Sequence, residues 1–182
     1  MRNKFLLMTA VLAAAIGAFS AWYFQQHLGG TLGAGAGSAA PPVGMARPDF
    51  QLRDLDNRMT PLSTWDGQVV LFNFWAAWCP PCRREIPEFS EVREFYREDG
   101  FEVVGIAIDD EENIRKFLAE LPDVRYPQLI GFNDAVQLGR ALGNRTGGLP
   151  YSVLVDRGGV IRFAKAGELS KAELIERVEA LL

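Results

Sequence analysis

The chain has 182 residues, of which 48% are hydrophobic, so it can build one substantial hydrophobic core but hardly two. All 23 acidic residues lie after Ala40, together with all of the 19 basic residues except Arg2 and Lys4. The rest of the chain therefore carries a net charge of −6, from 17 basic and 23 acidic residues, against −4 for the whole chain. This acidic balance argues against nucleic-acid binding.

The N-terminal segment predicts a membrane anchor over residues 1–27. Phe5–Phe24 is an apolar run long enough to span a bilayer, which takes about 20 residues. Arg2 and Lys4 precede it, so its N-terminus should stay in the cytoplasm and the rest should be exported. Trp22 and Tyr23 lie at its far end, where interfacial aromatic residues are expected. We expect a single-pass protein of the cytoplasmic membrane with its C-terminal domain on the periplasmic or extracytoplasmic side.

A cleavable signal peptide is the alternative, because Ala18-Phe19-Ser20 is an acceptable cleavage site. The apolar run is longer than a typical signal core, which favours the anchor. Residues 28–47 are uncharged up to Ala46 and rich in Gly and Ala, and they predict a flexible tether. A phosphate-binding loop is excluded there, because no Lys-Ser/Thr ending and no strand accompany the glycines.

The folded domain is expected over residues 48–182, beginning with a hairpin over Asp49–Trp65 that turns at Asp56-Asn57. Gln68–Phe74 then predicts a central strand buried on both faces. A helix is expected from Cys79 to Asp99, kinked at Pro87 and ended by Gly100. Its first turn holds both cysteines of the protein.

Cys79 and Cys82 are three residues apart between a predicted strand and a predicted helix, which is typical of a redox dithiol. With Cys79 at the helix N-cap, Pro80 and Pro81 would fill positions whose N–H groups have no helical partner. The helix N-terminus favours a thiolate, and Arg83 and Arg84 would add positive potential. We therefore expect Cys79 to be the exposed nucleophile and Cys82 to resolve the mixed disulfide.

Two other interpretations of the cysteine pair are weaker. A purely structural disulfide that closes so short a loop would stabilise the fold only slightly. A zinc site needs about four ligands, whereas the only histidine, His27, lies beside the N-terminal apolar segment.

The run from Phe74 to Cys82, Phe-Trp-Ala-Ala-Trp-Cys-Pro-Pro-Cys, with Pro87 further along, resembles the active site of the thioredoxin fold. The form is similar to the membrane-anchored TlpA/ResA-like thiol–disulfide oxidoreductases, and the similarity covers about residues 48–182. The resemblance implies an α/β thioredoxin-like fold, with a central mixed β-sheet flanked by helices. It implies no cofactor, because the dithiol itself carries two electrons.

The remaining elements fit this family. Strands are expected over Glu102–Ile108 and Tyr126–Ile130, with helices opening at Asp109 and covering Ala135–Leu142. The strand at Tyr126–Ile130 and the helix at Ala135–Leu142 are similar to the central α/β insert of the TlpA/ResA-like proteins. A hairpin of strands follows, over Tyr151–Asp156 and Val160–Ala164. Ser170 and Glu173 then form a predicted capping box for a last helix that runs to Leu182.

The resemblance also assigns a substrate surface. Pro150, after Gly147-Gly148-Leu149, stands where the thioredoxin fold has a cis-proline that faces the dithiol and holds the substrate backbone. The substrate contacts implied are Trp78, Pro80, Pro81, Leu149 and Pro150.

Two further positions distinguish ResA-like proteins from thioredoxins, which share the same fold. Glu85 follows Cys82 by three residues, on the same side of a helix. In ResA-like relatives a glutamate at this place is linked to reductive chemistry, and it could accept and return the proton of Cys82. A solvated acid on the helix surface is the alternative. Asn73 stands where thioredoxins carry a buried aspartate, and asparagine cannot transfer a proton, which makes Glu85 the better candidate for the base.

These observations predict an exported thiol–disulfide oxidoreductase that reduces disulfides of other exported proteins. By resemblance, its substrates would include apocytochrome c, and it would receive electrons from an upstream membrane donor of the thiol–disulfide type. The alternatives are an oxidase or isomerase in the same compartment and a non-enzymatic binding module that keeps the fold.

Overall fold

The computed structural model of the protein describes residues 42–182. The predicted membrane anchor and most of the predicted tether lie outside this range. Within residues 42–182, no helix is both long and apolar enough to cross a bilayer.

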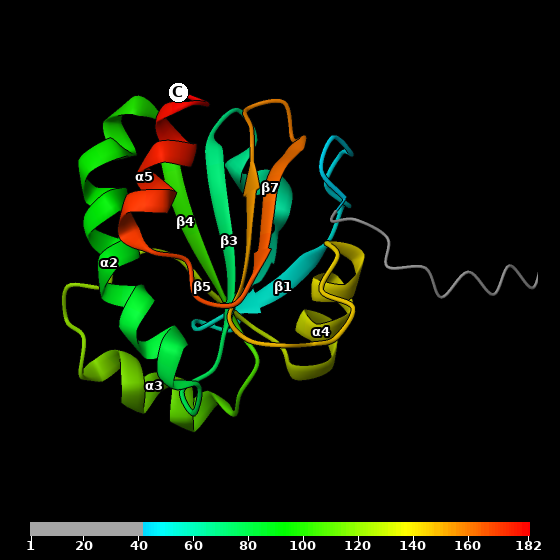
Figure 1. Ribbon diagram of the computed structural model, residues 1–182. Helices are drawn as coiled ribbons and strands as arrows, with labels where there is room; N and C mark the ends of the chain where they lie inside the picture. Colours follow the sequence, from blue (N-terminus) through cyan, green and yellow to red (C-terminus); the bar gives the residue numbers. More distant parts are fainter. Residues whose placement is uncertain (1–41) are drawn as a thin grey trace, which may run out of the picture. The chain divides into compact units, whose positions relative to one another are not determined.

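The centre of the domain is one mixed sheet of seven strands in the order β2-β1-β5-β4-β3-β6-β7 (Figure 1). Strands β3, β4 and β5 are parallel to one another, and the other pairings are antiparallel. The predicted thioredoxin-like α/β fold is confirmed. The strands are β1 (Gln51–Asp54), β2 (Met59–Pro61), β3 (Val69–Trp75), β4 (Phe101–Ala107), β5 (Gln128–Ile130), β6 (Tyr151–Val155) and β7 (Ile161–Ala166).

Helices cover both faces of this sheet (Figure 1). Helices α2 (Pro80–Tyr96), α3 (Glu111–Ala119) and α5 (Lys171–Glu179) bury apolar side chains in the core on one face. Helix α4 (Phe132–Ala141) and the 3₁₀ turn η1 (Leu62–Trp65) do so on the other face. Because both faces are covered, every residue of β3 is buried, as its continuous apolar sequence predicts.

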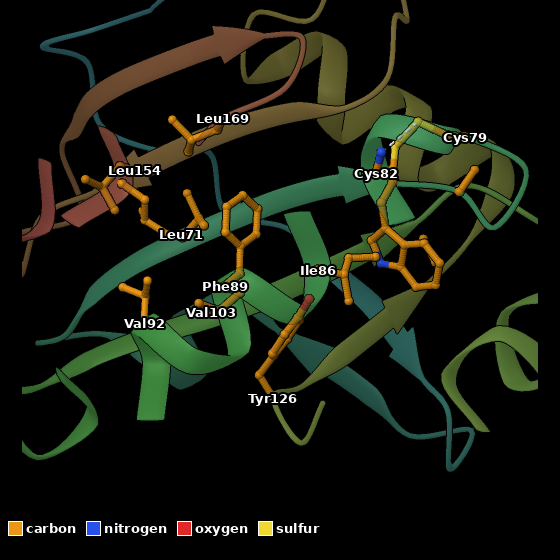
Figure 2. Packing of buried hydrophobic residues seen from close by; sticks show 14 of the residues in the cluster. Leu71, Cys79, Cys82, Ile86, Phe89, Val92, Val103, Tyr126, Leu154 and Leu169 are labelled. Atoms are coloured by element: carbon orange, nitrogen blue, oxygen red, sulfur yellow. Dashed lines mark hydrogen bonds between the residues drawn. A yellow bond between two sulfur atoms is a disulfide. The ribbon is translucent and has the colours of Figure 1, made fainter. Parts of the chain in front are cut away.

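The core beside α2 is built from large apolar side chains of the helix and of the central strands (Figure 2). Ile86 and Phe89 of α2 are fully buried, and they pack with Leu71 of β3 and Val103 of β4. Figure 2 shows this packing beside the disulfide, so the helix that carries the cysteines is fixed to the sheet.

The N-terminal hairpin and the central insert meet at one edge of the sheet. Strands β1 and β2 form the predicted hairpin, which turns through Asn57 at a φ of 69°. Strand β1 then pairs with β5, and β5 with α4 forms the predicted α/β insert. Strand β5 begins at Gln128, two residues later than predicted.

The folded domain begins earlier than the predicted boundary at residue 48. The Gly44 N–H donates to the Ile161 carbonyl (2.8 Å), and the Arg47 N–H donates to the Gly159 carbonyl (2.8 Å). Ala46 forms a bridge with Val160. Residues 44–47 therefore belong to the domain, because their backbone groups pair at the start of β7, an interaction that their composition does not reveal.

The helix ends differ slightly from the predictions. Helix α2 is followed by the 3₁₀ turn η2 (Arg97–Asp99), and Gly100 ends it with a φ of 87°. Ser170 caps α5 by accepting a hydrogen bond from the Glu173 N–H (3.3 Å). The other half of the capping box is absent, because the Glu173 carboxylate pairs with Lys165 instead. Helix α5 ends at Glu179, three residues earlier than predicted.

Candidate active site

The two cysteines lie directly after β3, at the start of α2. Cys79 is the N-cap residue, with extended backbone angles, and Pro80 and Pro81 occupy the first two helical positions. The predicted start of the helix is confirmed. Because the two prolines have no N–H, the Cys82 N–H and the positive end of the helix dipole are what the helix directs toward the Cys79 side chain.

The loop before Cys79 is held by Asp109, which follows the neighbouring strand β4. The Ala77 N–H donates to Asp109 Oδ2 (2.9 Å), and the Cys79 N–H donates to the Ala76 carbonyl (3.1 Å). The sequence analysis places Asp109 only at the opening of a helix. The structure gives it a positioning role, because β3 and β4 are parallel and their carboxyl ends lie side by side.

Cys79 and Cys82 form a disulfide, with their Cα atoms 5.3 Å apart (Figure 2). The Cys82 N–H donates to Cys79 Sγ (3.4 Å), a contact that would stabilise a thiolate on Cys79 once the bond is reduced. Cys79 is the more exposed of the two, as predicted, but the difference is small, at 3% against 0%. A substrate can therefore reach the disulfide only through the small exposed part of Cys79.

The two arginines after Cys82 do not add unopposed positive charge near the cysteines. Arg83 pairs with Glu120 (3.2 Å) and places its guanidinium 4.2 Å from the centre of the Phe117 ring. Arg84 pairs with Glu168 through two hydrogen bonds. Each arginine is thus paired with an acidic side chain from another element, which reduces the positive potential that it adds near the cysteines.

Glu85 is buried, with only 1% of its surface exposed, so it is not a solvated acid on the helix surface. Its two oxygens accept hydrogen bonds from Asn73 Nδ2 (2.7 Å) and from the Leu169 N–H (3.1 Å). Asn73 also donates to Ser152 Oγ (3.1 Å), which fixes the direction of its amide group. Glu85 and Cys82 thus lie in the same buried layer, one helical turn apart.

Burial raises the pKa of Glu85 to about 7. The hydrogen bonds from Leu169 and Asn73 lower this pKa, and the negative charges of Glu168 and Glu88 raise it further. At neutral pH the carboxyl group is therefore close to half protonated. A group in this state can both accept and return a proton near pH 7.

This raised pKa predicts how the stability of the oxidised protein depends on pH. Between the ordinary pKa of 4.5 and about 7, the folded state binds more protons at Glu85 than the unfolded state. The free energy of unfolding should therefore fall as the pH rises through this window, by about 3 kcal/mol from this group. Urea unfolding of the oxidised wild type and of Glu85→Gln, between about pH 4.5 and pH 8, measures the effect.

The variant isolates the Glu85 contribution, because every other titrating group is common to both proteins. The wild type should lose stability relative to Glu85→Gln as the pH rises. A difference between the two proteins that stays constant over the whole range would contradict the raised pKa.

The predicted substrate contacts differ in how exposed they are. Trp78 is 66% exposed, and it lines a hollow of about 350 Å³ together with Lys116 and Phe117 of α3. Pro80 is exposed and Pro81 is half-buried. Their role in substrate binding stays a prediction.

The loop before β6 carries the other two predicted contacts. The Leu149–Pro150 bond is cis, as predicted. Leu149 is half-buried and Pro150 is buried. The buried side chain of Asn144 holds this loop by donating to the Gly148 carbonyl (2.9 Å). That these residues bind substrate also stays a prediction.

The sequence analysis missed several polar residues around the site. Ser152 supports Asn73, and Gln128 accepts a hydrogen bond from Trp75 Nε1 (3.0 Å). Each is a single polar residue at a strand position that is otherwise apolar, and this signal could have identified both.

Comparisons with known proteins agree with this geometry. The model of the AhpC/TSA family matches residues 43–164. The thiol-disulfide oxidoreductase ResA of Geobacillus thermodenitrificans is 33% identical over 143 residues, which cover 78% of this chain and 79% of that protein. The ResA protein of Geobacillus kaustophilus is 26% identical over 99% of this chain and 97% of its own length.

A solved structure shows the same arrangement. A putative thiol:disulfide interchange protein DsbE from Chlorobium tepidum is 30% identical, with a TM-score of 0.71, and the match covers 78% of this chain and 99% of that chain. The similarity therefore covers the whole folded domain together with the cysteine pair.

Proposed function

The chain belongs to the AhpC/TSA family and is a thiol–disulfide oxidoreductase of the ResA type, and on this basis we propose that it is a membrane-anchored reductase of disulfides in exported proteins. One observation carries the proposal. A disulfide lies at the N-terminus of a helix, and a buried carboxyl group with a pKa of about 7 lies one turn further along.

The reaction begins from the reduced dithiol. The Cys79 thiolate attacks one sulfur of the substrate disulfide, and the substrate S–S bond breaks. One substrate sulfur leaves as a thiolate and takes up a proton, while the other is bound to Cys79 in a mixed disulfide. The helix N-terminus and the Cys82 N–H favour the attacking thiolate.

Cys82 then resolves the mixed disulfide. Glu85, in its ionised form, accepts the proton of the Cys82 thiol, and the resulting thiolate attacks Cys79 Sγ. The Cys79–Cys82 bond forms, and the second substrate sulfur leaves as a thiolate that is then protonated. Two electrons have passed from the enzyme to the substrate, and an upstream thiol donor must return them.

The charges around the site favour reduction of the substrate rather than its oxidation. A strong oxidant of this fold owes its potential to a stabilised thiolate in its reduced form. Here the acidic partners of Arg83 and Arg84 reduce the positive potential that these arginines add, and the buried Glu85 carboxylate disfavours a second negative charge on Cys82. Stabilisation of a thiolate in the reduced form is thus confined to Cys79, where the helix N-terminus and the Cys82 N–H supply it, and this supports a low reduction potential.

Location and partners complete the proposal. Residues 1–27 anchor the chain in the cytoplasmic membrane and place the domain on the extracytoplasmic side, as the charges at Arg2 and Lys4 and the apolar run indicate. The substrates are disulfides of exported proteins, including apocytochrome c before haem attachment. The donor is a membrane protein that carries a thiol pair.

The redox state of the protein in its own cells tests this proposal. Rapid acid quenching followed by alkylation with a large maleimide separates the dithiol from the disulfide on a gel. A reductase fed through the membrane should be found mainly as the dithiol during growth. The same protein found mainly as the disulfide would act as an oxidase, and the proposed direction would be wrong.

A further inference from the structure

The loop that joins β7 to α5 lies against the face of α2 that carries Glu85. Arg84 donates two hydrogen bonds to the Glu168 carboxylate, from Nε to Oε1 (3.0 Å) and from Nη2 to Oε2 (2.5 Å). Paired bonds of this kind fix the orientation of both side chains, in contrast to a single point contact. Glu168 is therefore attached to α2 at the residue that precedes Glu85.

The next residue in the loop makes the contact that matters for the site. The Leu169 side chain is fully buried in the core beside α2, and its backbone N–H donates to Glu85 Oε2 (3.1 Å). Because Glu168 and Leu169 are adjacent, a movement of the Glu168 backbone also moves this N–H group. The ion pair and the hydrogen bond are thus parts of one attachment.

The attachment continues one turn further along α2. Glu88 Oε2 accepts a hydrogen bond from the Lys171 N–H (3.2 Å), at the start of α5. Two residues of the loop and the first residue of α5 therefore contact neighbouring positions of α2. Of these, the Arg84–Glu168 pair lies nearest to the cysteines in the sequence.

We propose that Arg84 is a positioning residue: by holding Glu168, it keeps the Leu169 N–H hydrogen-bonded to Glu85 and so orients the carboxyl group that serves Cys82. This inference rests on the role of Glu85 proposed above. It assigns to Arg84 a function that acts through the loop and not through direct contact with the cysteines.

The charges around Glu85 define the sign of the expected effect. Glu88 on the same helix and Glu168 on the loop raise the pKa of Glu85, and Tyr126, which precedes β5, also interacts with this carboxyl group. Removing Arg84 takes away a nearby positive charge, leaves Glu168 unopposed and removes the ion pair that helps to hold the Leu169 N–H against Glu85. All three changes disfavour the ionised carboxylate, so the pKa of Glu85 should rise.

The test uses the full-length protein in its oxidised form, in which neither cysteine titrates. Glu85 is followed by the ¹³C chemical shift of its carboxyl group as a function of pH, in the wild type and in Arg84→Gln. We expect the midpoint to rise by at least about half a pH unit. Arg83→Gln is the matched control, because Arg83 is the preceding residue and pairs with Glu120 instead. It should leave the midpoint unchanged.

Two further measurements separate positioning from charge alone. Hydrogen exchange of the Leu169 amide should be faster in Arg84→Gln than in the wild type. In the double variant Arg84→Gln/Glu168→Gln, the unopposed charge is gone but the ion pair that holds the loop is still missing, so the midpoint should stay above the wild-type value. A midpoint that returns to the wild-type value, or a Leu169 amide that exchanges at the wild-type rate in Arg84→Gln, would overturn the proposal.

These readouts are independent of substrate and of the direction of electron transfer. A protein that proved to be an oxidase would still show the shift if Arg84 positions the loop. Conversely, an unchanged midpoint in Arg84→Gln would overturn the inference while leaving the reductase proposal intact.

Discussion

Replacing Cys79 with serine is expected to abolish disulfide exchange by the full-length protein, down to the uncatalysed rate. Only a thiolate attacks the substrate disulfide, and a serine hydroxyl at the same position is not ionised at neutral pH. The measurement is single-turnover reduction of a fluorescent peptide disulfide by protein that has been reduced beforehand. The fold should be unaffected, because the change replaces one sulfur atom at a site that is already at the start of a helix.

Cys82→Ser is the companion variant, and its expected behaviour is different. Cys79 can still attack, but no second thiol resolves the product, so a covalent mixed disulfide with the peptide should accumulate. A non-reducing gel detects this species. If Cys79→Ser trapped the peptide and Cys82→Ser did not, the roles of the two cysteines would be reversed.

Glu85→Gln is expected to slow the resolution step by about 10²-fold at neutral pH, the range typical of a lost general base. Glutamine has nearly the same shape but cannot accept the Cys82 proton. The rate of peptide release from the mixed disulfide, measured by stopped flow between about pH 5 and pH 9, should also lose its inflection near the pKa of about 7.

Glu94→Gln is the control for this substitution. Glu94 lies on the same helix, its side chain is 67% exposed, and it forms ion pairs with Arg93 and Arg97, away from the cysteines. The control should keep the wild-type rate and pH profile. If Glu85→Gln also kept both, Glu85 would have a structural role only.

The position of the active site could be predicted from the sequence because its determinants are local. The apolar run Gln68–Phe74 predicts a buried strand, and Cys79, Pro80 and Pro81 predict the start of a helix. Both predictions depend on neighbours in the chain, and both are confirmed. The capping residue Ser170 is a second example, since its own N-cap bond is local.

The environment of Glu85 could not be predicted in the same way. Its spacing from Cys82 places it on one side of a helix, but its burial depends on Leu169 and Asn73, which are 84 and 12 residues away in the sequence. The same limit applies to Arg83 and Arg84, whose ion pairs the sequence does not reveal. Their partners, Glu120 and Glu168, come from other elements that only the tertiary structure brings near.

Residues 44–47 illustrate a third kind of limit. Their Gly- and Ala-rich surroundings predict a tether, and nothing in their side chains indicates a strand. They are held by backbone hydrogen bonds to the start of β7, which any sequence without an interfering proline could form. Composition is therefore a poor guide to where this domain begins.

The reduction potential of the Cys79–Cys82 pair in the purified full-length protein tests the central claim most directly. Thioredoxin-like reductants lie near about −270 mV, and strong oxidants of this fold near about −120 mV. The ion-paired arginines and the buried Glu85 predict a value toward the reducing end of this range. A value toward the oxidising end would contradict the account and identify the protein as a disulfide donor.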